Sequence, residues 1–270
     1  MRESFGPADA ARWIAVPGPD DDKYSRGVLG VATGSARFPG AAVLGVEAAL
    51  HTGVGMVRYL GAELPTRLVL QRRPEAVASD GRVQAWVAGS GQDADAVDAV
   101  TAAHRDRALA DPVPTVIDAG ALGFAGRAAG IRVLVPHAGE LARLLDRERT
   151  EVIADPAGAA RETAARFAAV VLLKGHMSYV ADAAGGLLTV ACAPAWTATA
   201  GSGDALAGVL GALLATHAAE LEADQASAAQ IAATAAVLHG LAAGRASAGG
   251  PFTVLGLCAE LPAVVRELLG

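Results

Sequence analysis

Short apolar runs rich in β-branched residues alternate with longer helical patterns along this chain. That alternation restricts the possible folds more than any other feature of the sequence. Strands are expected where such runs are bounded by Gly, Pro or Asp. Alternating strands and helices build a mostly parallel sheet that is covered by helices on both faces, so we predict an α/β fold. The predicted strands are Val28–Ala32, Met56–Leu60, Val83–Ala88, Pro114–Asp118, Arg132–Val135, Val170–Lys174, Ser178–Ala181 and Leu187–Ala191.

The last two predicted strands are joined by Asp182-Ala183-Ala184-Gly185-Gly186, a turn-rich connection that favours a hairpin. The sheet is therefore expected to have an antiparallel edge. Residues 1–22 are rich in Pro and Asp and are predicted to be a loose lead-in, and residues 23–270 are predicted to form a single domain. Ligands of such folds bind beyond the carboxyl ends of the strands, which directs attention to the residues that follow each strand.

Charge and composition argue against several classes of protein. The formal net charge is −6, which opposes the basic surface expected of a nucleic-acid-binding protein. The N-terminus lacks the apolar segment of a signal peptide, and no uninterrupted apolar stretch has the length of a membrane span. The two cysteines, Cys192 and Cys258, have no metal-ligand spacing. We expect a cytoplasmic protein that binds a small molecule, with no nucleic-acid or membrane partner.

The segment Thr197–Gly208, with the sequence TATAGSGDALAG, is the most informative one for function. Its small residues let the backbone approach a ligand closely, and a helix begins within it. The first amide groups of a helix are unpaired and lie at the positive end of its dipole, which makes this an anion site suited to phosphate. The candidate phosphate-binding residues here are Gly201, Ser202 and Gly203.

Asp204 lies in the same segment, where its carboxylate could accept a proton from a hydroxyl near the bound phosphate. Asp is also a favoured residue at helix starts for purely structural reasons, and for the aspartate alone that interpretation is the stronger one. The glycines on both sides of Ser202 shift the balance toward phosphate, since capping does not require them. No Gly-Lys-Ser/Thr sequence follows, so the segment is not a Walker-type loop.

Two further segments bring polar residues to the carboxyl edge of the predicted sheet. VVLLKGHMS, residues 170–178, places Lys174 after a buried strand, where it could pair with phosphate or simply extend its ammonium group into solvent. LVPHAGELARLL, residues 134–145, places His137 before a helix, where an ordinary capping role is the simpler interpretation. The glycine-lined loop within residues 27–42 is predicted to reach the same edge.

The order of the motifs is more specific than any single one. After Lys23, Arg26 and Gly27 come TGSARFPGAA, VAGSG at 87–91, VIDAGAL at 116–122, VPHAGE at 135–140, LLKG at 172–175, TAGSGDALAG at 199–208 and Leu238-His239-Gly240. From about residue 23 onward, this series resembles the ADP/ATP-dependent NAD(P)H-hydrate dehydratases of the ribokinase-like superfamily. The resemblance implies a three-layer α/β/α domain whose mostly parallel sheet has an antiparallel edge.

The resemblance also implies roles for individual residues. Asp204 matches the catalytic aspartate that contacts the hydrated cofactor, and Gly203 matches a nucleotide-binding glycine. Ala41, Gly91 and His137 match positions that contact the hydrated cofactor. The stretch that matches the adenosine-nucleotide site consists of Lys174, Gly175, His176, Met177 and Ser178.

These roles imply a reaction. Transfer of the terminal phosphoryl group of ADP or ATP to the hydroxyl of hydrated NADH or NADPH turns a poor leaving group into a good one. Loss of phosphate then restores the reduced cofactor. Asp204 would accept the hydroxyl proton, while the amides of residues 201–204 would stabilise the phosphoryl charge. A divalent cation, Mg²⁺, would neutralise the nucleotide. The resemblance suggests ADP for bacterial members.

The sequence departs from the family pattern in several loops. Gly120 replaces an acidic residue, GSGQD at 89–93 replaces a more glycine-rich loop, and Ala200 replaces a glycine. Trp196 and Thr197 replace a Gly-Met pair. These changes keep two alternatives open: a small-molecule kinase on the same fold, and a nucleotide-binding module without turnover. The family also suggests a homo-oligomer, and the Ala-rich helix at 225–243 could pack against a second copy or be an ordinary core helix.

Overall fold

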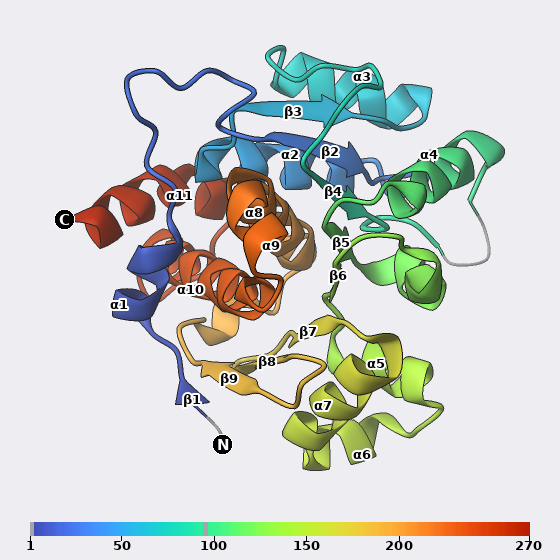
Figure 1. The fold of residues 1–270 in the computed structure, drawn as a ribbon, viewed down its shortest axis with the longest axis vertical. Coiled ribbons are helices and arrows are strands. Elements are labelled where there is room, and N and C mark those ends of the chain that lie inside the picture. The colour runs from blue at the N-terminus through green and yellow to red at the C-terminus, as the bar shows by residue number, and fades with distance from the viewer. Residues whose placement is uncertain (1–2, 94–96) are drawn as a thin grey trace.

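A computed structural model describes residues 3–93 and 97–270 and shows three layers, with helices on both faces of a sheet. The described residues form a nine-stranded sheet in the order β1-β9-β8-β7-β6-β5-β4-β2-β3 (Figure 1). The strands are β1 (Glu3–Ser4), β2 (Val28–Ala32), β3 (Met56–Tyr59), β4 (Ala85–Ala88), β5 (Thr115–Ile117), β6 (Arg132–Leu134), β7 (Val170–Leu173), β8 (Ser178–Ala181) and β9 (Leu187–Val190).

The helices divide between the two faces of the sheet, as Figure 1 shows to its left and right. One face is covered mainly by α2 (Gly40–Thr52), α8 (Ser202–Thr216), α10 (Ser227–Ser247) and α11 (Val254–Leu269), with α1 (Pro7–Ala10), α9 (Ala218–Ala223) and the short 3₁₀ helices η1 (Ala11–Trp13) and η3 (Ala195–Thr197) at its margin. The other face is covered by α4 (Ala99–Ala110), η2 (Ala119–Arg127), α5 (Ala138–Leu145), α6 (Arg149–Ala154) and α7 (Pro156–Phe167). Helix α3 (Glu63–Arg72) packs against α2.

All eight predicted strands are confirmed, with ends that differ by at most two residues. The predicted hairpin is also confirmed, because β8 pairs antiparallel with both β7 and β9, while the other pairs are parallel. The structure adds β1, which pairs with β9 through Glu3 and Ser4 and therefore lies outside the hairpin. Two residues are too few to show an alternating pattern, so this strand could not be predicted from periodicity.

Burial on both faces explains why the strands consist of nearly uninterrupted apolar residues. All five residues of β2 are buried. Leu29 and Val31 belong to the core under α8 and α10, whereas Val28 and Ala32 belong to the core under α4 and α5. Successive side chains of a strand point to opposite faces, so a strand covered on both sides must be apolar at every position.

Close packing between α2 and α8 fixes the position of the helix that carries Asp204. A Cβ atom added to Gly208 would overlap the carbonyl group of Gly45, so the two helix backbones approach where both residues are glycine. One turn further along α8, a Cβ added to Gly211 would overlap Val87 of β4. Helix α8 is therefore held between the sheet and α2 with little freedom to shift.

The structure also bears on two further expectations, one for the N-terminal segment and one for the Ala-rich helix. The segment expected to be a loose lead-in contains β1, and its Phe5 and Ala10 are buried in the core, so residues 3–13 are packed against the domain. The Ala-rich helix is part of α10, which is long and apolar enough to cross a membrane. However, 83% of its most apolar window is buried inside the protein. Helix α10 is thus an ordinary core helix. Of the two interpretations of the 225–243 segment, core helix or contact with a second copy, the structure supports the first.

Candidate active site

The candidate site lies at the carboxyl edge of the parallel strands. Strand β7 delivers Lys174, whose backbone amide donates to the carbonyl of Pro136 over 2.8 Å. This contact, with the bridge between Lys174 and His137, brings the ends of β6 and β7 side by side. The sheet therefore unites two segments that the sequence analysis selected independently, because the carboxyl ends of neighbouring parallel strands meet at one edge.

Helix α8 begins at this edge without a side-chain cap. Its N-cap residue, Gly201, has φ of 90°, a left-handed conformation that glycine adopts without strain. Within the residues that the structure describes, the amides of Gly203 and Asp204 have no hydrogen-bond acceptor. The first turn of α8 thus presents two unpaired N–H groups at the positive end of the dipole, which is the arrangement predicted for phosphate.

Lys174 lies next to this turn and is held by a buried carboxylate. Its Nζ is 2.7 Å from Oδ1 of Asp118 and 3.9 Å from Oε2 of Glu140. A Cβ added to Gly203 would come within 3.3 Å of the same Nζ, so the absence of a side chain there leaves room for the ammonium group. The Ser90 hydroxyl donates to the other oxygen of Asp118 over 2.9 Å. Lys174 is therefore positioned by a chain of partners rather than extended into solvent.

Electrostatics keeps Lys174 charged. Burial lowers the pKa of Lys174, but the negative charges of Asp118, Glu140 and Asp204 outweigh that effect, and the net result is a raised pKa. A cation beside two unpaired amides attracts a phosphate group.

Asp204 is the ionisable group whose position is best suited to proton transfer. Its pKa is raised to about 7, chiefly by burial and also by the charge of Asp118, against an opposing effect of Lys174. A carboxyl with a pKa near the working pH is present as both acid and base, which is what a general base requires. Asp204 projects from the same turn whose amides are unpaired, so it can take a proton from a group that lies beside a bound phosphate.

A cavity of about 630 Å³ opens between the α8 turn, the β7–β8 turn and the 193–199 segment. This volume is typical of sites for small molecules and cofactors. Its walls contain seven of the predicted site residues: His137, Lys174, Gly175, His176, Ser178, Ser202 and Gly203. Met177 belongs to the same β7–β8 turn, with 36% of its surface exposed, and Gly201 and Asp204 adjoin the wall through the α8 turn.

Ala41 and Gly91 lie apart from this cavity but touch each other. A Cβ on Gly91, whose φ is 66°, would overlap the Ala41 methyl group. Gly91 follows Ser90, the residue that holds Asp118, and Ala41 lies one helical turn before Gly45, which packs against the backbone of Asp204. The Ala41–Gly91 contact is thus linked to the site through Ser90, which bonds to Asp118, and through Gly45, which lies against the backbone of Asp204.

His137 occupies a capping position. Its Nδ1 accepts hydrogen bonds from the amides of Gly139 and Glu140, and Oε2 of Glu140 accepts one from the backbone amide of His137. The ring nonetheless remains 57% exposed at the cavity wall. The structure brings His137 together with Lys174 rather than with Ala41 and Gly91, so these three of the four residues predicted to contact the hydrated cofactor lie in two groups.

Sequence reasoning missed two buried residues of this site. Asp118 was seen only as part of a motif, although its place at the end of a buried strand was a usable signal. His239, on α10, lies in the cavity wall and contacts Ser202. Nothing in the local sequence indicates that contact, because the two residues are 37 positions apart.

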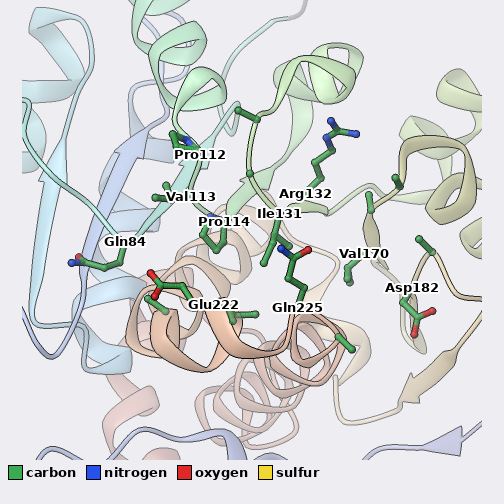
Figure 2. Close-up of a pocket in the computed structure, with 18 of the residues that line it drawn as sticks. Gln84, Pro112, Val113, Pro114, Ile131, Arg132, Val170, Asp182, Glu222 and Gln225 are labelled. Carbon is green, nitrogen blue, oxygen red and sulfur yellow. The ribbon is translucent and has the colours of Figure 1, made fainter.

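A second cavity, of about 680 Å³, lies at the opposite end of the sheet. Figure 2 shows Gln84, Pro114, Ile131 and Val170 around it, residues that precede or begin strands β4 to β7. Glu222 and Gln225 face them from the end of α9 and the connection that follows it. None of the predicted site residues lines this cavity, and the unpaired amides of α8 belong to the other edge.

Magnesium fits this site as a complex with nucleotide rather than as an ion held by the protein alone. In the part of the chain that the structure describes, no group of three or more His, Cys, Asp or Glu side chains could hold a metal. Mg²⁺ commonly takes one or two carboxylates and completes its shell with phosphate oxygens and water. Asp204 and Glu140 are carboxylates close enough to Lys174 to fit such a complex.

Comparison with known proteins agrees with the geometry. The sequence model of the NAD(P)H-hydrate dehydratase family matches residues 29–255. A bifunctional NAD(P)H-hydrate repair enzyme of Mycobacterium tuberculosis is 45% identical over 220 residues, which cover 77% of this chain and 44% of that protein. The chain thus spans about half the length of such relatives. An ADP-dependent (S)-NAD(P)H-hydrate dehydratase of Neisseria meningitidis is 35% identical, covering 83% of this chain and 78% of that protein.

The fold is shared with solved structures. The ADP/ATP-dependent NAD(P)H-hydrate dehydratase of Bacillus subtilis, co-crystallised with ATP and Mg²⁺, superposes with a TM-score of 0.86 at 24% identity, over 98% of each chain. Identity at that level establishes the fold alone. The ribokinase-like three-layer architecture predicted from the sequence is thereby confirmed.

Proposed function

Because this chain belongs to the NAD(P)H-hydrate dehydratase family, we propose that it is a hydro-lyase that restores hydrated NADH or NADPH with the help of ADP or ATP. The observation that carries this proposal is the first turn of α8. Two unpaired amides, the Lys174 ammonium group and a carboxyl with a pKa of about 7 converge there. Phosphoryl transfer to a hydroxyl needs a phosphate cradle, a compensating cation and a base.

Each residue contributes a definite step. Lys174 and the Gly203 and Asp204 amides bind the terminal phosphate of the nucleotide and stabilise the charge that develops on it. Asp204, in its ionised form, accepts the proton of the substrate hydroxyl as the oxygen–phosphorus bond forms. The nucleotide, shortened by one phosphoryl group, departs, and the phosphate now on the substrate is a good leaving group. The lone pair of the ring nitrogen expels that phosphate to give an iminium ion, and loss of a proton from the adjacent ring carbon restores the dihydronicotinamide. Mg²⁺ bound with the nucleotide supplies further charge neutralisation.

The predicted site residues divide between the two ligands. The nucleotide binds in the cavity lined by Lys174, Gly175, His176, Ser178, Ser202 and Gly203, with Met177 and Gly201 beside it. The hydrated cofactor binds beside the contacting residues Ala41 and Gly91, on the other side of Asp204 from the nucleotide. His137 lies at the cavity wall, at the boundary between the two ligands. We place the dehydratase domain at residues 23–270, with residues 3–13 packed against it and β1 added to its sheet, and the protein in the cytoplasm.

The test is recovery of absorbance at about 340 nm when hydrated NADH is mixed with the protein, Mg²⁺ and either ADP or ATP. Recovery that depends on nucleotide supports the dehydratase and identifies the phosphoryl donor. Accumulation of a stable phosphorylated product would instead indicate a small-molecule kinase, which could use the same phosphate cradle. Nucleotide binding without consumption, with any candidate substrate, would indicate a binding module.

A further inference from the structure

His239 is a buried residue that the proposed reaction does not use. It belongs to the Leu238-His239-Gly240 sequence of α10, and only 7% of its surface is exposed. Its Nε2 lies 3.0 Å from the carbonyl oxygen of Ser202 and 3.1 Å from the Ser202 hydroxyl oxygen. A carbonyl oxygen can only accept a hydrogen bond, so Nε2 must carry the ring proton and donate a hydrogen bond to the Ser202 carbonyl.

This contact acts on the peptide group that carries the Gly203 amide. The peptide bond between Ser202 and Gly203 is planar, and in the trans form its N–H points away from its C=O. A donor on the carbonyl therefore fixes the direction of the N–H on the other side. It also polarises the peptide, which makes the N–H a stronger donor. The Gly203 amide is one of the two unpaired groups of the α8 turn.

We propose that His239 is a positioning residue that orients and polarises the Ser202–Gly203 peptide for the terminal phosphate of the nucleotide. The inference rests on the proposed use of this turn as a nucleotide site. It does not depend on which hydroxyl compound receives the phosphoryl group. His239 acts through the peptide, and no proton passes to or from the reactants through it.

The protonation state of the ring agrees with this role. Burial lowers the pKa of His239 to about 4, the Ser202 backbone raises it, and the charge of Lys174 lowers it. The imidazole is therefore neutral at physiological pH and contributes an oriented dipole. The cation that balances phosphate charge at this turn is Lys174.

Packing of α10 explains the rest of the motif. A Cβ added to Gly240 would come within 2.8 Å of the Cys192 carbonyl carbon and 2.9 Å of the Ala193 amide. Glycine lets the helix approach this segment, whose next residues form the cavity wall. The side chain of Leu238 is fully buried. Leu238 and Gly240, the neighbours of His239 in the chain, thus fix the position of the helix that brings His239 to Ser202.

The experiment measures the affinities of the whole protein for ADP and AMP, in the presence of Mg²⁺, by titration calorimetry. His239→Leu should weaken ADP binding about five- to tenfold, the usual effect of losing one hydrogen bond. AMP lacks the terminal phosphate, so its affinity should not change. His239→Gln keeps an N–H donor near the position of Nε2 and should restore ADP affinity.

The matched control is His217→Leu. His217 is equally buried, and its Nδ1 contacts the Leu213 carbonyl at the far end of α8, so this variant should bind both nucleotides as the unmodified protein does. Unchanged ADP affinity in His239→Leu, equal losses for ADP and AMP, or failure of His239→Gln to restore binding would each overturn the inference. If His239→Leu does not fold, His239→Asn replaces it: its shorter side chain cannot place an N–H at the position of Nε2, so ADP affinity should fall and AMP affinity should not, and unchanged ADP affinity would overturn the inference.

Failure of the proposed function gives a different result. Intact ADP binding without recovery of hydrated NADH would refute the proposed substrate and leave the role of His239 standing. Absence of ADP binding by the unmodified protein would refute the nucleotide site itself, and the inference with it.

Discussion

Replacing Asp204 with Asn should stabilise the protein while removing its turnover. The pKa of this carboxyl is raised from its ordinary value of 3.8 to about 7, chiefly by burial and also by the charge of Asp118, while Lys174 opposes the rise. The folded state therefore holds the proton more tightly than the unfolded state does. The stability that this group contributes is fully present below about pH 3.8 and is lost as the pH rises through about 7.

The size of the effect follows from the same values. A rise in pKa from 3.8 to about 7 corresponds to about 4 kcal/mol of unfavourable free energy for the ionised carboxylate in the folded state. Asn has the same shape and no charge, so Asp204→Asn should recover up to about 4 kcal/mol at pH 8. Turnover should fall by about 10²- to 10⁴-fold, since the general base is lost.

The measurement is urea-induced unfolding of both proteins at pH 8 and at pH 4.5. The variant should have the higher free energy of unfolding at pH 8, and the difference should shrink at pH 4.5, where the wild-type carboxyl is mostly protonated. Asp20→Asn, which changes an exposed carboxylate of the N-terminal segment, is the control and should change neither value. In the wild type, kcat/KM should rise with pH up to about 7 and then level off.

Equal stability at pH 8 would refute this reasoning. So would a difference of the same size at both pH values, because the cause could then not be the titration of Asp204. A flat pH profile of kcat/KM between pH 5 and pH 8 would remove Asp204 as the general base, even if Asp204→Asn were inactive.

Three further substitutions test the surroundings of Asp204. Lys174→Met should weaken ADP binding and, because Lys174 lowers the pKa of Asp204, move the rise of kcat/KM to higher pH. The same change leaves Asp118 buried without its cation, so the free energy of unfolding in urea should fall by about 3–5 kcal/mol. Asp118→Asn should move the same rise to lower pH, because the charge of Asp118 raises the pKa of Asp204. Gly208→Ala should lower the free energy of unfolding by about 1–3 kcal/mol, because its methyl group would overlap the Gly45 carbonyl, and an unchanged melting temperature would contradict the packing described for α2 and α8.

The fold could be predicted because its strands are buried on both faces. Strands such as Val28–Ala32 and Val170–Leu173 are uninterrupted apolar runs, and such runs are visible in a sequence. Strand β1 could not be predicted, since Glu3 and Ser4 pair with β9 through backbone groups across more than 180 residues of chain. Local sequence contains periodicity and turn residues, but it contains no record of such long-range pairing.

In the candidate site, too, local features could be predicted and long-range contacts could not. The glycines of the α8 turn and the position of Lys174 after a strand were visible, because they are local features. The partners of Lys174 were not, since Asp118 lies 56 residues away and reaches it only when β5, β6 and β7 are aligned. The role assigned to His137 had a similar limit. Its capping bonds are local and were expected, whereas its place beside Lys174 follows from the sheet.

Two departures from the family pattern, Gly120 and the 89–93 loop, are structurally linked. A Cβ on Gly120 would overlap the carbonyl group of Gln92, so a residue with a side chain at 120 is incompatible with the path of the 89–93 loop. Gln92 in turn bonds to the Ala32 carbonyl through Nε2, while its buried Oε1 has no partner among the described residues. This loop contains Gly91, which contacts Ala41, and Ser90, which donates to Asp118, while Asp118 and Lys174 stay paired. The two departures therefore bear on the Ala41–Gly91 contact, where we place the hydrated cofactor, while the phosphate side keeps the Lys174–Asp118 pair and the Ser90 hydrogen bond to Asp118.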